Sequence, residues 1–202
     1  MIKKKLLFIT AFVCLLPIVL GIVLWDRLPD TMAIHFDLNG NANGFASKAF
    51  VVFGLPIIMA VMQAILCITN DLSVKNHNQS PKIDGMTKWI IPVMTVVLYV
   101  MTILVALGYN VDTRRVCMVI IGAVMLVTGA CMKKLDYVKN RDYDAETAKR
   151  INKLSGNLMM VMGALFIASI LFPPMATVIC LGLLMVCGVI ISVYSVKASN
   201  GM

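Results

Sequence analysis

Residues 155–194 read SGNLMMVMGALFIASILFPPMATVICLGLLMVCGVIISVY, a run of 40 residues without a charged side chain or a histidine. A helix needs about 20 mostly apolar residues to cross roughly 30 Å of bilayer hydrocarbon, so the run is long enough for two spans. Pro173 and Pro174 divide it, and two prolines end a helix because they remove amide donors and bias the preceding residue away from helix. We therefore predict two membrane-spanning helices joined by a tight hairpin.

The same apolar pattern recurs along the rest of the chain. Six segments are long enough to span a membrane, and none contains Asp, Glu, Lys, Arg or His. They are Leu6–Leu24, Ala49–Thr69, Ile90–Leu107, Val116–Met132, Ser155–Phe172 and Met175–Tyr194. Ion-coupled transporters usually hold ionisable groups inside their spans, so this pattern argues against active pumping.

The composition also indicates a membrane protein. Hydrophobic residues make up 60% of the chain and charged residues 14%, and the mean hydropathy is +0.90. Soluble domains average roughly 45–50% and about 25%, respectively. The net charge of +8 sits in short clusters between the apolar runs. We assign it to membrane topology and lipid headgroups, and we expect no nucleic-acid partner.

Lys and Arg are distributed unequally between alternate loops. One set of loops and termini carries fourteen of them and the other set carries four. Because positive residues accumulate on the cytoplasmic side, this count predicts that both termini are cytoplasmic. The expected fold is an all-α integral membrane protein with about six transmembrane helices and a small ordered extracellular loop between the first two. The oligomeric state is left open by the sequence.

The loop at residues 25–48 reads WDRLPDTMAIHFDLNGNANGFASK. Apolar Ile34, Phe36 and Leu38 alternate with polar residues, which is the period of a short, half-exposed strand. The Asn-Gly pairs that begin at Asn39 and Asn43 supply residues that tolerate positive φ. We therefore predict an ordered loop, with a small hairpin as its form.

We expect no metal, cofactor or catalytic site. The loop resembles the front of an EF-hand, but the twelfth position is Phe50 or Lys48 where a bidentate Glu is needed. His35 has no second histidine on its side of the membrane, and there is no nucleophile with a partner. His35 either hydrogen-bonds within the loop or helps to form a binding surface. The chain is therefore expected not to be an enzyme.

The loop resembles the signature of a short bacterial membrane domain of uncharacterised role, which is commonly found ahead of an SdpI-like membrane core. The matching positions are Leu28, Pro29, Ile34, His35, Asn39, Gly40, Gly44 and Lys48. This resemblance implies a two-span hairpin at residues 1–70, with the outward loop 25–48, and a four-span SdpI-like core at residues 71–202. It also implies a multi-pass protein of the bacterial cytoplasmic membrane.

The SdpI family includes immunity proteins, so the resemblance implies protection against a secreted peptide toxin by binding. The expected toxin-binding residues are His35, Asp37, Asn39, Gly40, Gly44 and Lys48. A second reading is a signalling receptor that recruits a cytoplasmic repressor through residues 133–153, with Lys149, Arg150 and Lys153 as its contacts. This chain lacks the Arg-Thr-Pro-Trp stretch that the SdpI-like core carries in that loop. A third reading is a passive channel or permease for a small solute.

Two further patterns concern helix packing. Residues 144–153 are expected to form a short helix with a Glu146–Arg150 ion pair, since the two side chains are four residues apart in the favourable order. Gln63 and Asn157 are the clearest polar side chains within the spans, and we expect them to hydrogen-bond between helices. Small residues four apart suggest close approaches between helices. These pairs are Ala60/Ala64, Ala164/Ala168 and Gly188/Ser192.

Overall fold

The computed structural model describes residues 4–75, 81–133 and 145–200. Six of its helical segments are long and apolar enough to cross a membrane. These segments are Lys4–Val23, Phe50–Val74, Asp84–Ala106, Thr113–Lys133, Glu146–Leu171 and Pro174–Val196. The prediction of six helices of spanning length is therefore confirmed, and each helix extends beyond its apolar run at one end or at both.

The described residues form two compact units, and each is treated separately below. The first unit combines residues 1–72 with residues 84–114, and the second combines residues 73–83 with residues 115–202. The third span thus packs with the first two. The division at residue 70 into a two-span hairpin and a four-span core stays a prediction about domain organisation.

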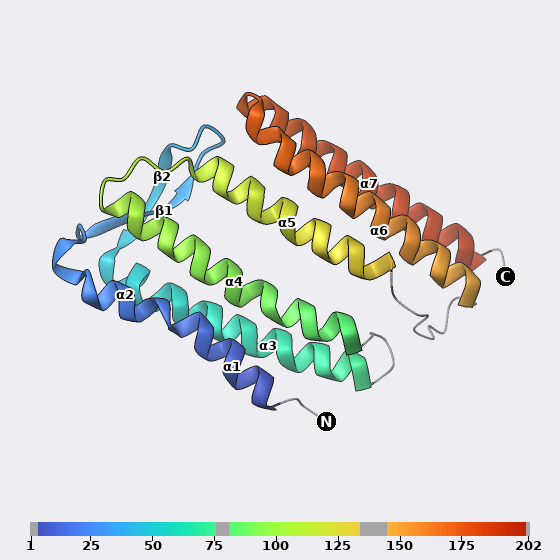
Figure 1. Ribbon diagram of the computed structural model, residues 1–202, viewed down its shortest axis with the longest axis horizontal. Coiled ribbons are helices and arrows are strands. Elements are labelled where there is room, and N and C mark those ends of the chain that lie inside the picture. Colours follow the sequence, from blue (N-terminus) through green and yellow to red (C-terminus); the bar gives the residue numbers. More distant parts are fainter. Residues whose placement is uncertain (1–3, 76–80, 134–144, 201–202) are drawn as a thin grey trace. The chain divides into compact units, whose positions relative to one another are not determined.

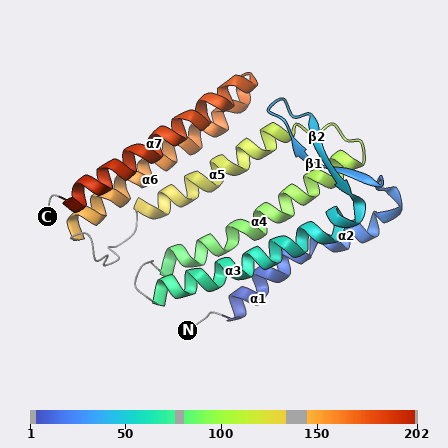
Figure 2. The same cartoon turned by 180° about the vertical axis from the view of Figure 1, so that it is seen from behind.

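The first unit contains three side-by-side spans with a small β-hairpin at one end (Figures 1 and 2). Its elements are α1 (Lys4–Leu15), α2 (Pro17–Val23), η1 (Trp25–Arg27), β1 (Thr31–Phe36), β2 (Ala42–Ser47), η2 (Phe50–Gly54), most of α3 (Leu55–Lys75) and most of α4 (Pro81–Ala106). Pro17 has no amide hydrogen, which explains why the first span is interrupted at Leu16. Below the hairpin, a core formed by Leu28, Met32, Val52 and Tyr99 joins the loop to the helices.

The hairpin is antiparallel, and its register runs from the pair Thr31 and Ser47 to the pair Phe36 and Ala42. The register is irregular on either side of His35. The predicted ordered loop is thus a two-stranded sheet, and the rest of the described fold is helical. The first Asn-Gly pair, at Asn39, lies in the turn, whereas the second, at Asn43, lies inside β2.

The second unit contains α5 (Thr113–Lys133) from residue 115, α6 (Ala145–Ala168), the short η3 (Ser169–Leu171) and α7 (Pro174–Asn200). Its core is built mainly from Met125, Met162, Phe166 and Cys180. The predicted hairpin at the two prolines is confirmed, since η3 ends at Leu171 and α7 begins at Pro174. The helix predicted at residues 144–153 is continuous with the fifth span as α6, and residue 144 lies outside the described residues.

Candidate functional site

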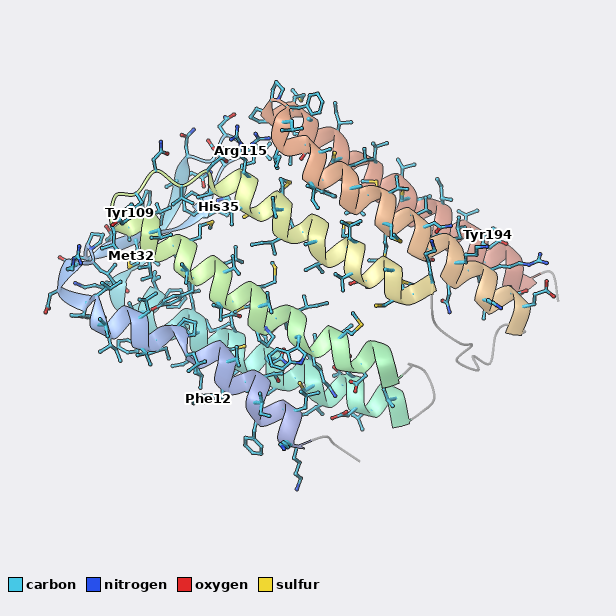
Figure 3. The ribbon with its side chains drawn as sticks, viewed as in Figure 1. Phe12, Met32, His35, Tyr109, Arg115 and Tyr194 are labelled. Carbon is cyan, nitrogen blue, oxygen red and sulfur yellow. The ribbon has the colours of Figure 1, made fainter. Side chains whose placement is uncertain are left out.

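The β-hairpin lies at the end of α4 (Figure 3), where Tyr109 follows the helix. Met32 and Ala33 of β1 are buried, and Met32 packs in the core beside Val52 and Tyr99. The next residue, Ile34, is 41% exposed. One part of β1 therefore anchors the hairpin to the helices, while the residues after it project from the surface.

The turn of the hairpin is organised by the side chain of Asp37. Its Oδ1 atom accepts hydrogen bonds from the backbone amides of Asn39 and Asn41, each at 2.9 Å. Its Oδ2 atom accepts a third from the Asn41 side chain at 3.3 Å. These bonds, led by that from the Asn41 amide, lower the pKa of the exposed Asp37 carboxyl below its ordinary value of 3.8. The charged form of Asp37 therefore stabilises the turn.

Gly40 completes this turn with a backbone that side chains rarely adopt. Its φ is +87°, in the left-handed region that favours glycine. Its carbonyl accepts a hydrogen bond from Thr113 Oγ1 at 3.4 Å, which ties the tip of the hairpin to the start of α5 within the same unit. The role that the structure supports for Gly40 is thus conformational.

Gly44 lies across the hairpin from His35, and the two residues are paired in the register. A Cβ atom at Gly44 would lie 2.8 Å from the Cβ of His35, so a larger residue here would force the strands apart. The His35 Nδ1 and Asn43 Oδ1 atoms are 2.5 Å apart. Because an amide oxygen can only accept, the His35 ring donates this bond as Nδ1–H.

Lys48 turns back onto the chain at the base of the hairpin. Its ammonium donates to the backbone carbonyls of Trp25 at 3.3 Å and Leu28 at 3.1 Å. It also lies 3.5 Å from the exposed Asp30 carboxylate and 4.9 Å from the centre of the Trp25 ring. Only 15% of its side chain is exposed. Lys48 follows β2, and its contacts therefore connect the end of the hairpin to the segment that precedes β1.

The six expected binding residues thus fall into two groups. Asp37, Gly40, Gly44 and Lys48 shape or anchor the hairpin, whereas His35 and Asn39 are exposed. Sequence reasoning did not select the apolar side chains that project beside them. Leu38 is 49% exposed and Phe45 is 62% exposed. Their exposure depends on the strand register, which the sequence alone does not specify.

The expected cytoplasmic contacts lie at the start of α6. Lys149, Arg150 and Lys153 are all exposed. Arg150 Nη2 lies 2.5 Å from Glu146 Oε1, so the predicted ion pair is confirmed. The divergent segment that would complete this surface includes residues 134–144, which lie outside the described residues.

A second cluster was missed by the sequence analysis. The Lys88 ammonium lies 2.6 Å from Asp71 Oδ1 and 2.7 Å from Asp84 Oδ1, and none of the three side chains is more than 4% exposed. All three residues lie inside helical segments of spanning length. The six apolar segments themselves contain no ionisable group, and these three residues lie just beyond them. The apolar runs were taken to end at Thr69 and to begin again at Ile90, but the helices extend into the flanking polar residues.

One of the interhelical hydrogen bonds expected from the sequence is present in the same region. Gln63 Nε2 of α3 donates to the Lys88 carbonyl of α4 at 2.7 Å, which confirms the prediction for Gln63. Nearby, Asn70 Nδ2 donates to Thr87 Oγ1 at 2.9 Å. Polar side chains thus join α3 to α4 at two levels along the helices. The C-terminal end of α3 and the N-terminal end of α4 lie opposite the hairpin (Figure 1).

A family model described as a domain of unknown function, DUF1648, matches residues 12–60. The similarity runs from α1 through the β-hairpin into α3. It confirms that the N-terminal segment is similar to a known domain without an assigned role. No curated protein and no solved structure matches the chain.

Proposed function

We propose that this chain is a binding protein of the bacterial cytoplasmic membrane, with both termini in the cytoplasm, that protects its cell from a secreted peptide toxin. The β-hairpin would face outside and contact the toxin directly. No bond is made or broken in this function. The SdpI-like character of residues 71–202, which suggested immunity, rests on sequence resemblance.

The observation that carries the proposal is the pairing of a firmly held hairpin with exposed side chains suited to recognition. Ile34, Leu38 and Phe45 project apolar groups, and His35 and Asn39 place polar groups beside them. Burial of exposed apolar side chains supplies affinity, and polar neighbours supply specificity. A scaffold that is already ordered loses little conformational entropy when a ligand binds.

The anchoring residues have a different part in this proposal. Asp37 and Gly40 hold the turn, and Lys48 holds the base, so the recognition surface is presented in one conformation. They support toxin binding through the shape of the hairpin. The substitutions that test recognition are therefore those of the exposed residues.

The test is survival of a sensitive bacterium that expresses the chain and is challenged with secreted peptide toxins, starting with any encoded beside it. We expect protection from one toxin, and loss of protection in a His35→Ala, Leu38→Ser, Phe45→Ser variant that still inserts into the membrane. The control is Lys149→Ala, Arg150→Ala, whose side chains are exposed on α6. Full protection by the correctly inserted hairpin variant would overturn recognition by the hairpin.

Two other measurements distinguish the alternative functions. A receptor that responds to an outside ligand and recruits a repressor predicts that the loop at residues 133–153 captures a cytoplasmic partner, and that Lys149→Ala, Arg150→Ala weakens this capture. A passive channel predicts solute flux in liposomes that neither variant changes. No feature of residues 4–75, 81–133 and 145–200 favours either alternative over toxin binding.

A further inference from the structure

The β-hairpin has two strands, so the outer edge of each strand is left unpaired by the sheet itself. The register pairs Thr31 with Ser47 and continues without a shift as far as Phe45 on β2. One step before the first pair, the Lys48 amide donates to the Asp30 carbonyl at 2.8 Å. Hydrogen-bonded and non-hydrogen-bonded pairs alternate along an antiparallel ladder. The backbone amides of Phe45 and Ser47 therefore point away from β1.

Within the first unit, β2 is the exposed strand of the hairpin. Met32 and Ala33 of β1 are consecutive, so their side chains point to opposite faces of the sheet, and both are buried. Every residue of β2 is exposed or half-buried, and Phe45 is 62% exposed. The centre of β1 is thus covered on both faces, whereas β2 is open.

The β2 edge also lacks two features that usually block an exposed strand. Proteins protect such edges with charged residues, prolines or bulges. The strand reads ANGFAS, with no charged residue and no proline, and the irregular register at His35 lies nearer the turn. Within residues 4–75, 81–133 and 145–200, no backbone hydrogen bond outside the ladder uses the amide of Phe45 or Ser47. The edge therefore presents two donors, two residues apart, at an exposed place.

We propose that the outer edge of β2 binds an extended segment of the peptide toxin as an additional strand. This inference rests on the proposed function and specifies how the hairpin recognises its ligand. The Phe45 and Ser47 amides donate to carbonyls of the toxin, and the Phe45 carbonyl accepts from a toxin amide. In strand addition, backbone bonds supply affinity and alternate side chains supply specificity. The matching segment is extended, has an amide available opposite Phe45, and places an apolar side chain beside the Phe45 ring.

Residue-resolved amide hydrogen exchange tests the edge directly. The protein is the full chain in lipid nanodiscs, and the probe is the peptide toxin from which it protects cells in the survival assay. We expect the Phe45 and Ser47 amides to exchange quickly in the protein alone and slowly once the toxin is added. The Ala46 amide points toward Met32 and should be slow in both states. Fast exchange of Phe45 and Ser47 in the complex would overturn strand addition, whatever any variant does.

Proline substitutions test the same edge in cells. Ser47→Pro removes the outward amide of β2 and no hydrogen bond between the two strands, so we expect loss of protection by a chain that still inserts. Thr31→Pro is the matched control, because it removes the outward amide at the paired position of β1 and should keep protection. Proline is tolerated in edge strands where the amide faces away from the ladder. Equal protection by the two inserted variants would overturn binding at the β2 edge.

The outcomes separate this inference from the proposed function. If the wild-type chain protects from no toxin, the proposed function fails and strand addition fails with it. If the chain protects and the toxin leaves the exchange of Phe45 and Ser47 unchanged, strand addition alone fails and recognition by side chains stands. Slow exchange of both amides before toxin is added would show an edge already paired, as with a second copy of the chain, and would also overturn the proposal.

Discussion

Asp37 and Lys48 show how single charged side chains fix the shape of the hairpin. Each was expected to contact a ligand, and each forms hydrogen bonds with backbone groups of its own chain. Backbone groups in a short loop have few partners in regular secondary structure, so a charged side chain that reaches them has a large effect on local order. The consequences can be measured separately for the tip and for the base of the hairpin.

The turn at Asp37 should depend on acidity. The pKa of Asp37 is lowered in the folded protein, chiefly by the hydrogen bond from the Asn41 amide. The stabilising effect is therefore complete above the unfolded value of 3.8 and is lost as the pH falls through the lower folded value. We expect amide hydrogen exchange at residues 39–41 to show constant protection from pH 7 to about 5 and a loss of protection below about pH 4, after correction for intrinsic rates.

The Asp37→Asn variant is the matched control for this titration. An amide oxygen can still accept one bond but carries no charge, so turn protection should be weaker and should show no acid step. An acid step of the same size in the variant would assign the titration to another carboxyl.

Lys48 should matter for stability more than an exposed lysine such as Lys149 does. In Lys48→Met, the carbonyls of Trp25 and Leu28 lose a charged donor while the apolar stem is kept. We expect the free energy of unfolding to fall by about 1–3 kcal/mol. Lys149→Met, at an exposed position on α6, should change it by less than about 0.5 kcal/mol. If denaturation of the two purified variants shows equal losses in the free energy of unfolding, the stabilising role of the Lys48 hydrogen bonds is contradicted.

At the scale of helices, α5 and α6 approach each other through paired glycines. A Cβ at Gly122 would lie 2.6 Å from the Gly163 carbonyl oxygen, and a Cβ at Gly129 would lie 2.6 Å from that of Gly156. Small residues allow membrane helices to approach each other this closely. Lipid is as apolar as the helices, so van der Waals packing stabilises the contact and the hydrophobic effect does not. The pairs expected from the sequence were spaced four apart on one helix, whereas these pairs are seven apart on each helix.

Adding one methyl group tests this contact. Gly129→Ala places an atom against the backbone of α6 and should destabilise the fold by about 1–3 kcal/mol. Gly182→Ala is the matched control, because a Cβ there meets nothing within 4 Å. It should be neutral or slightly stabilising, since Ala favours helix over Gly. Thermal unfolding in detergent measures both, and a neutral Gly129→Ala would contradict the close helix contact.

For the whole molecule, the fourteen-to-four distribution of Lys and Arg predicts the orientation. Single cysteines placed at Asn41 and at Lys149, in a chain whose own six cysteines are replaced, should react differently with an impermeant reagent. We expect labelling of position 41 in intact cells and of position 149 only after the membrane is opened. The reverse pattern would place the hairpin in the cytoplasm and contradict toxin recognition outside the cell.

Local composition was enough to predict six helices of spanning length, the last hairpin and an ordered loop. Runs of about 20 apolar residues predict spans because of the thickness of the bilayer, and the two prolines near residue 173 predict the last hairpin because they cannot donate to a helix. The order of Ile34, Leu38 and the first Asn-Gly pair likewise indicated a half-exposed strand and its turn. Each of these conclusions depends on neighbours in the sequence, which can be read directly.

What only the tertiary structure decided is where polar side chains are directed. Lys88 was assigned to a loop because its neighbours in the sequence are polar. In the structure its side chain is buried and paired with Asp71 on α3 and with Asp84, one turn earlier on α4. Lys48 donates to backbone carbonyls at the base of the hairpin, whereas Phe45, for which the sequence made no prediction, is 62% exposed. These outcomes follow from contacts between residues distant in sequence, and the free energy of a charge depends on those contacts more than on its flanking residues.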